Sequence, residues 1–186
     1  MIIDTKNGNE NASAFFLFAK FYFRKENKDM ALAGISTLGV KLYRGVETTA
    51  GVKPATFEQL TRINSIGGLT ISSENIDASA LEDEVTRYVA GRGDADGSIA
   101  VTVNLTQDTI AEWEDVIADA ATAKAAGKSM WFEIYSPSLG GDAFFIVAEP
   151  PTAIPMPETN QNELWTVEMT LTVNEYKGMD TAVLPA

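Results

Sequence analysis

The stretch SIAVTVNL, residues 98–105, shows the alternation that decides the fold class. Apolar residues occupy every second position, and small polar residues stand between them. The apolar residues are Ile99, Val101, Val103 and Leu105. This period of two is that of a β-strand with one buried face, because successive side chains of a strand point to opposite sides. Residues 98–105 therefore predict a strand that lies against a hydrophobic core.

A helix is predicted shortly after this strand, over residues 109–126, TIAEWEDVIADAATAKAA. Thr109 and Glu112 have the spacing of a capping box, and Gly127 is a natural stop. Apolar residues line one face at helical spacing, namely Ile110, Trp113, Ile117 and Ala121. We expect this face to pack against the strands.

Short runs with strand character lie on both sides of these two elements. They are residues 38–46, 57–63, 86–91, 129–136, 143–149 and 164–173. Short connections favour antiparallel pairing, and 129–136 is expected to pair with 143–149. The chain is therefore predicted to be mainly β, a β-sandwich or small barrel of about seven antiparallel strands with one α-helix packed on it. The tail from Glu175 onward has no partner of its own in this scheme.

The stretch GRGDADG, residues 91–97, admits three interpretations. Arg92-Gly93-Asp94 is the tripeptide that animal adhesion receptors recognise, and the following Asp and Gly residues resemble the start of a calcium loop. A calcium loop needs more ligands and a distal Glu, which the residues after it do not supply. Gly and Asp suit a hairpin turn, which is the interpretation we favour. The acidic residues 72–85 upstream are predicted to form a solvated loop.

The composition is acidic and lacks two residue types that are common in active sites. The formal net charge of the 186 residues is −12, and the chain has no Cys and no His. An acidic surface repels phosphates, which argues against a protein that reads nucleic acid. Thiol nucleophiles, disulfides, Cys/His zinc sites and histidine bases are excluded. No catalytic, cofactor-binding or metal-binding residue is predicted, and a carboxylate-based hydrolase is the least favoured class. The chain is not expected to be an enzyme.

The N-terminal residues 1–29 differ in character from the rest of the chain. The apolar run FFLFAKFYF, residues 15–23, is interrupted by Lys20 and is far shorter than a membrane span of about 20 residues, so no membrane association is predicted. A typical protein start follows at Met30. Residues 1–29 are interpreted as a translated leader or as an arm that docks on a neighbour. The expected division is an extension 1–29, a β-domain 30–174 and a C-terminal arm 175–186.

From about Ala31 to Val173 the order of elements resembles that of the major tail tube proteins of long-tailed, siphovirus-type bacteriophages. The resemblance rests on the strand segment GISTLGVKLYRG, the polar loop VETTAGVKPAT, the acidic stretch SSENIDASALEDE, the strands of YVAGRGDADGSIAVTVNL, the helix and the strand LWTVEMTLTVN. It implies a β-sandwich subunit that forms hexameric rings. The rings stack into a hollow tube, and its channel passes DNA into the host without specific binding.

The same resemblance implies partners and positions for contact residues. Expected partners are further copies of the chain and other tail proteins, such as tape measure, terminator and tip proteins, with no cofactor. The expected location is the virion tail, after assembly in the host cytoplasm. Loops and arms join adjacent rings in that family, and the matching segments here are 47–57, 72–85 and the tail after Asn174. The candidate loop residues are Glu47, Thr49, Lys53, Pro54, Phe57, Glu74, Asp77 and Glu82. Glu133 and Glu168, on polar strand faces, are the candidates for charges that face the channel.

A carbohydrate-binding β-sandwich module is the alternative. In such a module, exposed aromatic side chains form a platform for a sugar ring, and Trp131, Tyr135 and Trp165 are the candidates here. Each of the three also suits a core or interface position. Sugar affinity of a monomer would favour the module, whereas polymerisation that depends on concentration would favour the tube.

Overall fold

A computed structural model of the chain describes residues 34–95 and 97–185. The chain divides into two compact units, Met1–Ser36 and Thr37–Ala186, and the fold described below is that of the second unit. The predicted leader or arm, residues 1–29, lies outside the described residues. No helix among the residues that the structure describes is long and apolar enough to cross a membrane.

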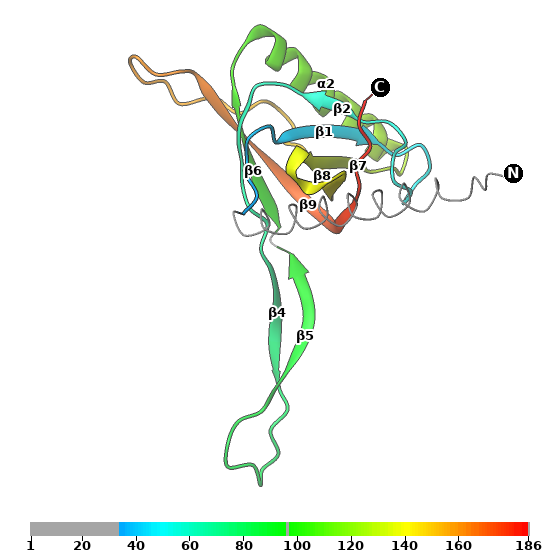
Figure 1. The fold of residues 1–186 in the computed structure, drawn as a ribbon, viewed down its shortest axis with the longest axis vertical. Helices are drawn as coiled ribbons and strands as arrows, with labels where there is room; N and C mark the ends of the chain where they lie inside the picture. Colours follow the sequence, from blue (N-terminus) through cyan, green and yellow to red (C-terminus); the bar gives the residue numbers. More distant parts are fainter. Residues whose placement is uncertain (1–33, 96, 186) are drawn as a thin grey trace, which may run out of the picture. The chain divides into compact units, whose positions relative to one another are not determined.

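The described residues form nine strands, one α-helix and a short 3-10 helix (Figure 1). In chain order these are β1 (Lys41–Val46), β2 (Glu58–Leu60), β3 (Ile63–Ile66), β4 (Ile71–Asp77), β5 (Tyr88–Ala95), β6 (Ser98–Asn104), α2 (Gln107–Ala125), β7 (Met130–Tyr135), η2 (Pro137–Leu139), β8 (Asp142–Glu149) and β9 (Thr166–Thr181). All paired strands are antiparallel, and β7 pairs with β8 as expected. The prediction of a mainly β chain with one helix packed on it is confirmed.

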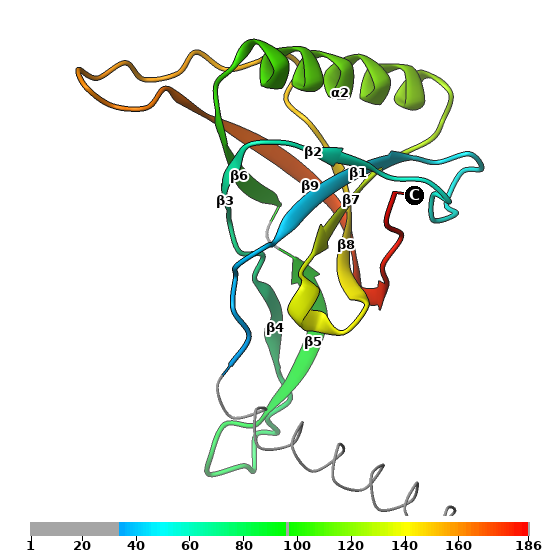
Figure 2. The same cartoon turned by 45° about the horizontal axis from the view of Figure 1, so that its top comes forward.

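Seven of the strands form one sheet in the order β2-β1-β7-β8-β9-β6-β3. The two edge strands, β2 and β3, follow each other in the chain, with only Thr61 and Arg62 between them. The opposite edges of the sheet therefore lie near each other, and the sheet curls toward a small barrel (Figure 2). Arg62 forms the corner with a positive φ of 56°, and its carbonyl accepts a hydrogen bond from the backbone N–H of Asn104 at 3.0 Å.

The predicted cap at Thr109 is wrong: helix α2 is capped by Thr106. The Thr106 side chain accepts a hydrogen bond from the Thr109 N–H at 3.1 Å, and the Thr109 hydroxyl accepts one from the Thr106 N–H at 2.8 Å. A threonine therefore occupies the position for which a glutamate was sought. Trp113 and Val116 of the helix are fully buried, whereas Ile110 and Ala121, both expected on the packed face, are exposed.

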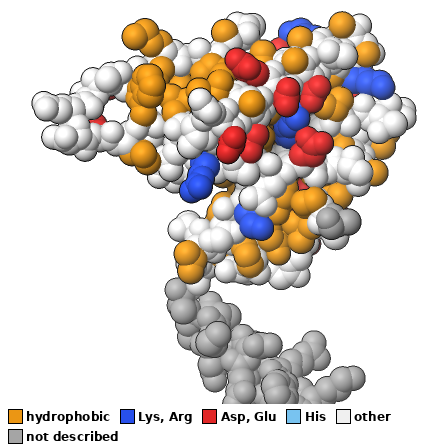
Figure 3. Space-filling view, turned by 90° about the horizontal axis from the view of Figure 1, so that it is seen from above, with side chains coloured by type: hydrophobic (Ala, Val, Ile, Leu, Met, Phe, Trp, Pro, Cys, Tyr) orange, Lys and Arg blue, Asp and Glu red, His pale blue; other side chains and the backbone are white. Residues whose placement is uncertain are grey.

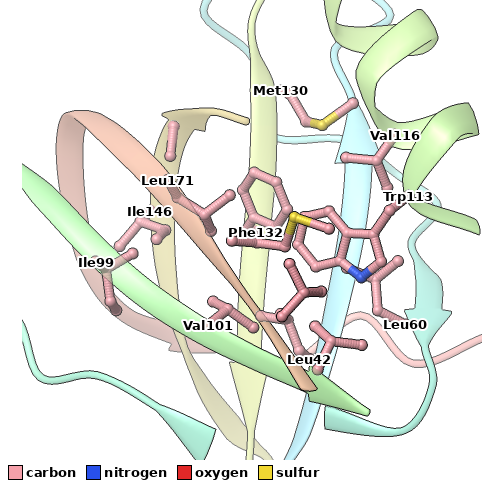
Figure 4. Close-up of a cluster of buried hydrophobic side chains, with 14 residues drawn as sticks. Leu42, Leu60, Ile99, Val101, Trp113, Val116, Met130, Phe132, Ile146 and Leu171 are labelled. Carbon is pink, nitrogen blue, oxygen red and sulfur yellow. The ribbon is translucent and has the colours of Figure 1, made fainter. Parts of the chain in front are cut away.

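The inner face of the curled sheet packs against α2 around Phe132 and Trp113 (Figure 4). This inner cluster contains Leu42, Leu60, Ile99, Val101, Val103, Trp113, Val116, Met130, Phe132, Ile146, Ala148, Val167, Met169 and Leu171. Burial of a large apolar side chain stabilises a fold by about 1.5–3 kcal/mol relative to exposure. The inner cluster, which six strands and the helix share, is therefore the main source of stability.

A second cluster covers the outer face of the same sheet over β1, β7 and β8. This outer cluster contains Tyr43, Phe57, Trp131, Ala143, Phe145 and Val147. Phe57 precedes β2, and the other five alternate along β1, β7 and β8 with residues of the inner face. The Phe145 ring meets Phe57 and Trp131 at centroid distances of 5.8 and 6.4 Å. Strands β7 and β8 are thus buried on both faces, while the outer face of β6 and β9 is polar.

Strands β4 and β5 pair only with each other and form a two-stranded sheet, here called the ribbon (Figure 1). Two predictions are wrong at this place. Residues 72–77 form a strand and not part of a solvated loop. The stretch GRGDADG is not a turn between two paired strands, because Gly91 to Ala95 belong to β5, which pairs with β4 and not with β6. A Cβ on Gly91 would lie 2.6 Å from the carbonyl oxygen of Glu74, so this glycine permits close pairing rather than a turn.

Strand β9 continues to Thr181, beyond its predicted end at residue 173. The prediction that the tail from Glu175 onward has no partner is wrong for residues 175–181, which pair with β8. The register shifts twice along this pairing, and Gly178 takes a φ of 81°. Bulges let a strand continue although the alternation of its apolar residues is interrupted.

Candidate assembly surfaces

The ribbon carries large apolar side chains that are more than half exposed. All seven residues of β4 are exposed. The exposed apolar residues of the ribbon and its tip are Ile71, Ile76, Leu81, Val85, Tyr88 and Val89. A two-stranded hairpin is at best marginally stable on its own in water, and clustered exposed apolar residues mark interaction sites. The ribbon is therefore the strongest candidate for a surface that binds another protein.

Apolar residues lie on both faces of the ribbon. The register shifts between the pair Ser73–Gly93 and the pair Asn75–Ala90. This interval spans two residues on β4 and three on β5, so the extra residue lies on β5. The side chains of β4 therefore alternate without interruption, and Ile71 and Ile76 point to opposite faces. The surroundings of two β5 glycines support this assignment of the two isoleucines to opposite faces. A Cβ on Gly93 would be nearest to Ile71, whereas one on Gly91 would approach Ile76.

Three predicted contact residues, Glu74, Asp77 and Glu82, lie on the ribbon or its tip and are exposed. Asp77 accepts hydrogen bonds from the hydroxyl and the backbone N–H of Ser79, the latter at 2.9 Å, and these bonds lower the pKa of its carboxyl. Asp77 thus has a local role in the turn at the tip. The sequence reasoning found this segment by its charge, but it missed the apolar residues.

Glu47, another predicted contact residue, is instead part of the interior, with only 4% of its surface exposed. One carboxylate oxygen accepts hydrogen bonds from the backbone N–H groups of Gly51 and Ser129, each at 3.0 Å, and the other accepts one from the Trp131 indole at 2.8 Å. Burial acts to raise the pKa of Glu47, but the hydrogen bonds from Trp131, Gly51 and Ser129 outweigh it and the pKa is lowered. Glu47 therefore fixes the start of loop 47–57 as a charged acceptor.

The remaining candidates of loop 47–57 divide between surface and interior. Thr49 is exposed, Pro54 and Phe57 are buried, and Lys53 is partly buried. The Lys53 ammonium lies 2.8 Å from a carboxylate oxygen of Asp180. The loop is thus folded onto its own subunit, and Thr49 is the one of these four side chains that stands free of packing.

The outer face of β6 and β9 forms a polar strip. Its cross-strand pairs are Ser98 with Thr172, Ala100 with Thr170, Thr102 with Glu168 and Asn104 with Thr166. Glu168 is exposed and is the one charged residue in these pairs. Glu133, expected on a similar polar face, is instead fully buried and accepts a hydrogen bond from the backbone N–H of Val183 at 3.1 Å. Of the two carboxylates, Glu168 alone is placed to face open space in the subunit.

Residues 150–165 form an exposed connection that the sequence reasoning treated only as a crossing between strands. Met156 is 94% exposed and Trp165 is 53% exposed, with Leu164 between them in exposure. This segment extends to the left in Figure 1, and apolar side chains are exposed at the left of the view from above in Figure 3. It is a second apolar surface available for contact.

The three aromatic residues considered for a sugar platform do not share an exposed surface. Trp131 is buried in the outer cluster, and Tyr135 is partly buried against it. Trp165 is exposed at the end of a connection without regular structure. The arrangement therefore does not favour the carbohydrate-binding alternative.

Comparison with solved structures finds this fold in tail and baseplate assemblies. A chain from the tail of an empty GTA particle, refined helically with C6 symmetry, matches 80% of this chain and 99% of its own length at 14% identity, with a TM-score of 0.51. A chain from the sixfold symmetrised baseplate of the anti-feeding prophage matches 81% of this chain and 98% of its own at 11% identity, with a TM-score of 0.52. A chain from the SPP1 tail tube matches 81% of this chain and 81% of its own length at 13% identity, with a TM-score of 0.50.

No protein-family model and no curated protein sequence matches the chain. The likeness is therefore one of three-dimensional structure, and it extends over most of the residues that the structure describes. The fold that the resemblance implied is confirmed: this chain has the fold of the proteins that build these tail tubes and baseplates.

Proposed function

We propose that this chain is a structural subunit that self-assembles into stacked hexameric rings, which form a tail tube through which DNA passes. The observation that carries the proposal is the fold, which is shared with chains of assemblies that have sixfold symmetry. The exposed ribbon supports it, because its apolar side chains need a partner outside the subunit. The chain would act in the virion tail, after assembly in the host cytoplasm.

The ribbon is proposed to join neighbouring subunits of the tube. Because Ile71 and Ile76 lie on opposite faces, a partner that covers one face leaves the other in water. Insertion between two neighbouring copies covers both faces. The part of the C-terminal arm that can join rings begins after Val183, because residues up to Thr181 belong to β9 and Ala182 and Val183 pack on the outer cluster. Thr49 is the residue of loop 47–57 that we retain as a contact candidate.

The polar strip on β6 and β9 is proposed to face the channel. Its residues are Ser, Thr, Ala and Asn with the single charge of Glu168. DNA binds proteins largely through phosphate contacts to Lys and Arg, and such contacts would slow its passage. A strip without cations, on a chain with a net charge of −12, avoids them. Other tail proteins, such as the tape measure, terminator and tip proteins, would contact the ends or the interior of the tube.

Negative-stain electron microscopy across a series of protein concentrations tests the assembly directly. We expect hollow tubes or rings, with sixfold symmetry in class averages viewed along the axis. Analytical ultracentrifugation of the same samples measures the fraction of assembled protein. Rings of another symmetry would refute the hexamer, and a monomer at every concentration would refute self-assembly.

Substitutions in the ribbon test which surface carries the contact. Ile76→Lys places a charge on an exposed apolar site, so it should leave the subunit folded and strongly reduce the assembled fraction. Ile76→Val is the matched control, because it keeps an apolar side chain at the same site and should assemble. Ile71→Lys tests the opposite face in the same way. Full assembly of both lysine variants would show that the ribbon is not the contact.

A further inference from the structure

Residues near the C-terminal end of β9 cross the outer cluster and are held there by hydrogen bonds from their backbone N–H groups. The N–H of Ala182 donates to the carbonyl of Gly141 at 2.9 Å, and the N–H of Val183 donates to the Glu133 carboxylate at 3.1 Å. The side chains of Ala182 and Val183 pack against the outer cluster. Residues 180–183, here called the strap, thus cover aromatic side chains that would otherwise face water.

Lys53 fastens the strap from the other side. Its ammonium group donates to the Asp180 carboxylate at 2.8 Å and to the Thr181 carbonyl at 2.7 Å. The same group lies 3.9 Å from the centroid of the Phe145 ring, within the range of a cation–π contact. Loop 47–57 and the strap are therefore linked through one side chain, and both lie on the outer cluster.

Glu133 is the buried group at the centre of this arrangement. One of its oxygens accepts the bond from Val183, and the other has no hydrogen-bond partner among the described residues. Burial raises the pKa of Glu133, although the Val183 N–H and the Lys53 charge act to lower it. Burial also raises the pKa of Tyr43, the cross-strand partner on β1, and Glu133 itself and Tyr135 raise it further. The groups that face Glu133 are therefore Tyr43 from β1, Tyr135 from β7, Lys53 from its loop and, through Lys53, Asp180 from β9.

We infer that residues 180–183 are a strap that opens and closes over the outer cluster, and that closure is coupled to uptake of a proton by Glu133. The closed strap shields the carboxylate from water, so an ionised Glu133 opposes closure, whereas a protonated one does not. Opening returns the carboxyl to water and its pKa toward the ordinary value of 4.5. Closure is therefore most favourable at low pH. It weakens as the pH rises from about 4.5 to the raised pKa of the closed state.

This inference concerns the single subunit and does not depend on the proposed assembly. Opening would expose Tyr43, Trp131 and Phe145, which lie beneath the strap and loop 47–57. The strap is short and ends in residues that are only partly buried. Its first two residues, Asp180 and Thr181, are the end of β9, so opening releases only their pairing with Ala143 and Asp142 and leaves the rest of β9 paired. The outer cluster, unlike the inner cluster, thus has a cover that responds to pH.

Hydrogen exchange measured by mass spectrometry on the dilute, monomeric full chain tests the coupling. The readout is the protection of Ala182 and Val183 at several pH values, divided by the exchange of a free peptide of the same sequence. In the unchanged chain, the opening constant should rise with pH, by up to about tenfold per unit for one linked proton, and then level off. Peptides from residues 144–149 of β8, which do not pair with the strap, and from β6 report whether the strands remain intact.

Three variants decide the result. Glu133→Gln keeps an acceptor for Val183 without an ionisable group, so its opening constant should not change with pH. Val183→Pro removes the N–H that binds Glu133, so Ala182 should lose protection at every pH. Glu168→Gln, at an exposed site, is the matched control and should retain the normal pH dependence. A pH dependence that survives in Glu133→Gln, or full protection of Ala182 in Val183→Pro, would overturn the inference.

Discussion

Replacement of Glu47 by glutamine tests how a single buried carboxylate holds loop 47–57. The carboxylate accepts three hydrogen bonds, two on one oxygen and one from the Trp131 indole on the other. Glutamine keeps one oxygen for the two backbone donors but presents an NH₂ group to the indole. One buried donor is then left without an acceptor, which costs about 1–3 kcal/mol of the free energy of unfolding. Glu47→Ala removes both acceptor oxygens, leaves all three donors without this partner and should cost about 3–5 kcal/mol.

Urea unfolding of the dilute protein, followed by tryptophan fluorescence, measures these differences. Each kcal/mol lost from the free energy of unfolding also lowers the melting temperature of a chain of this length by about 2–4 °C. Glu82→Gln is the matched control, because Glu82 is exposed, and it should change stability by less than about 0.5 kcal/mol. Equal stability of Glu47→Gln and Glu82→Gln would refute the reasoning.

The same pair of proteins gives a prediction for pH. The pKa of Glu47 is lowered in the folded state, so the folded chain binds fewer protons than the unfolded chain in the acid range. The contribution of Glu47 is complete above the ordinary value of 4.5 and is lost as the pH falls through the lowered pKa. The stability gap between the unchanged chain and Glu47→Gln should therefore narrow below about pH 4.5. A gap that stays constant to lower pH would contradict the charged state assigned to Glu47.

Three further substitutions test separate parts of the fold. Thr106→Ala removes the cap of α2 and should lower the free energy of unfolding by about 0.5–2 kcal/mol in urea titrations; no change would mean that the cap is dispensable. Gly91→Ala would place a Cβ 2.6 Å from the Glu74 carbonyl oxygen, so hydrogen exchange should speed up in β4 and β5 while the main sheet keeps its protection. Equal exchange in the ribbon would contradict this packing. Phe132→Ala leaves a cavity in the inner cluster and should destabilise the chain by about 3–5 kcal/mol, and a smaller loss would show that the cluster collapses around it.

The main sheet was predictable wherever one face of a strand is apolar and the other polar. Strand β6 meets this condition along its whole length, because Ile99, Val101 and Val103 are buried and the residues between them are not. Strands β7 and β8, which are buried on both faces, were located as short apolar runs, and their pairing followed from the short connection between them. The sheet order was beyond this reasoning, since alternation shows that a strand has a buried face and does not show which strand lies beside it.

The predicted strand 86–91 overlaps β5 of the ribbon, but β4 and its pairing with β5 were missed because both faces of the ribbon are exposed. A strand without a buried face has no reason to alternate, and the sequence SSENID of β4 is rich in residues that disfavour strands. The glycines of GRGDADG were interpreted as turn residues, but Gly91 permits close pairing of β5 with β4 at a bulge. Local composition therefore predicted a loop where pairing between distant residues produces a ribbon.

The candidate site residues show where charge misleads a sequence-based reading. Glu133 alternates with Phe132 and Ile134, so its face was interpreted as polar and open. Trp131 and Tyr135 share that face, and their size was the signal that it would be covered. The role of Glu47 depends on Trp131, which is 84 positions away in the chain, and no local pattern connects the two.

The lengths of the sheet edges bear on how such a subunit avoids aggregation. The open edges of the main sheet are β2 and β3, with three and four residues, while the longest strands lie inside it. Edges this short have few unpaired backbone N–H and C=O groups with which a strand of another chain could form hydrogen bonds. The ribbon has edges of seven and eight residues. Aggregation of this chain should therefore start at the ribbon. The segment proposed to join subunits in the assembled tube is thus also the segment most prone to aggregate when it lacks its partner.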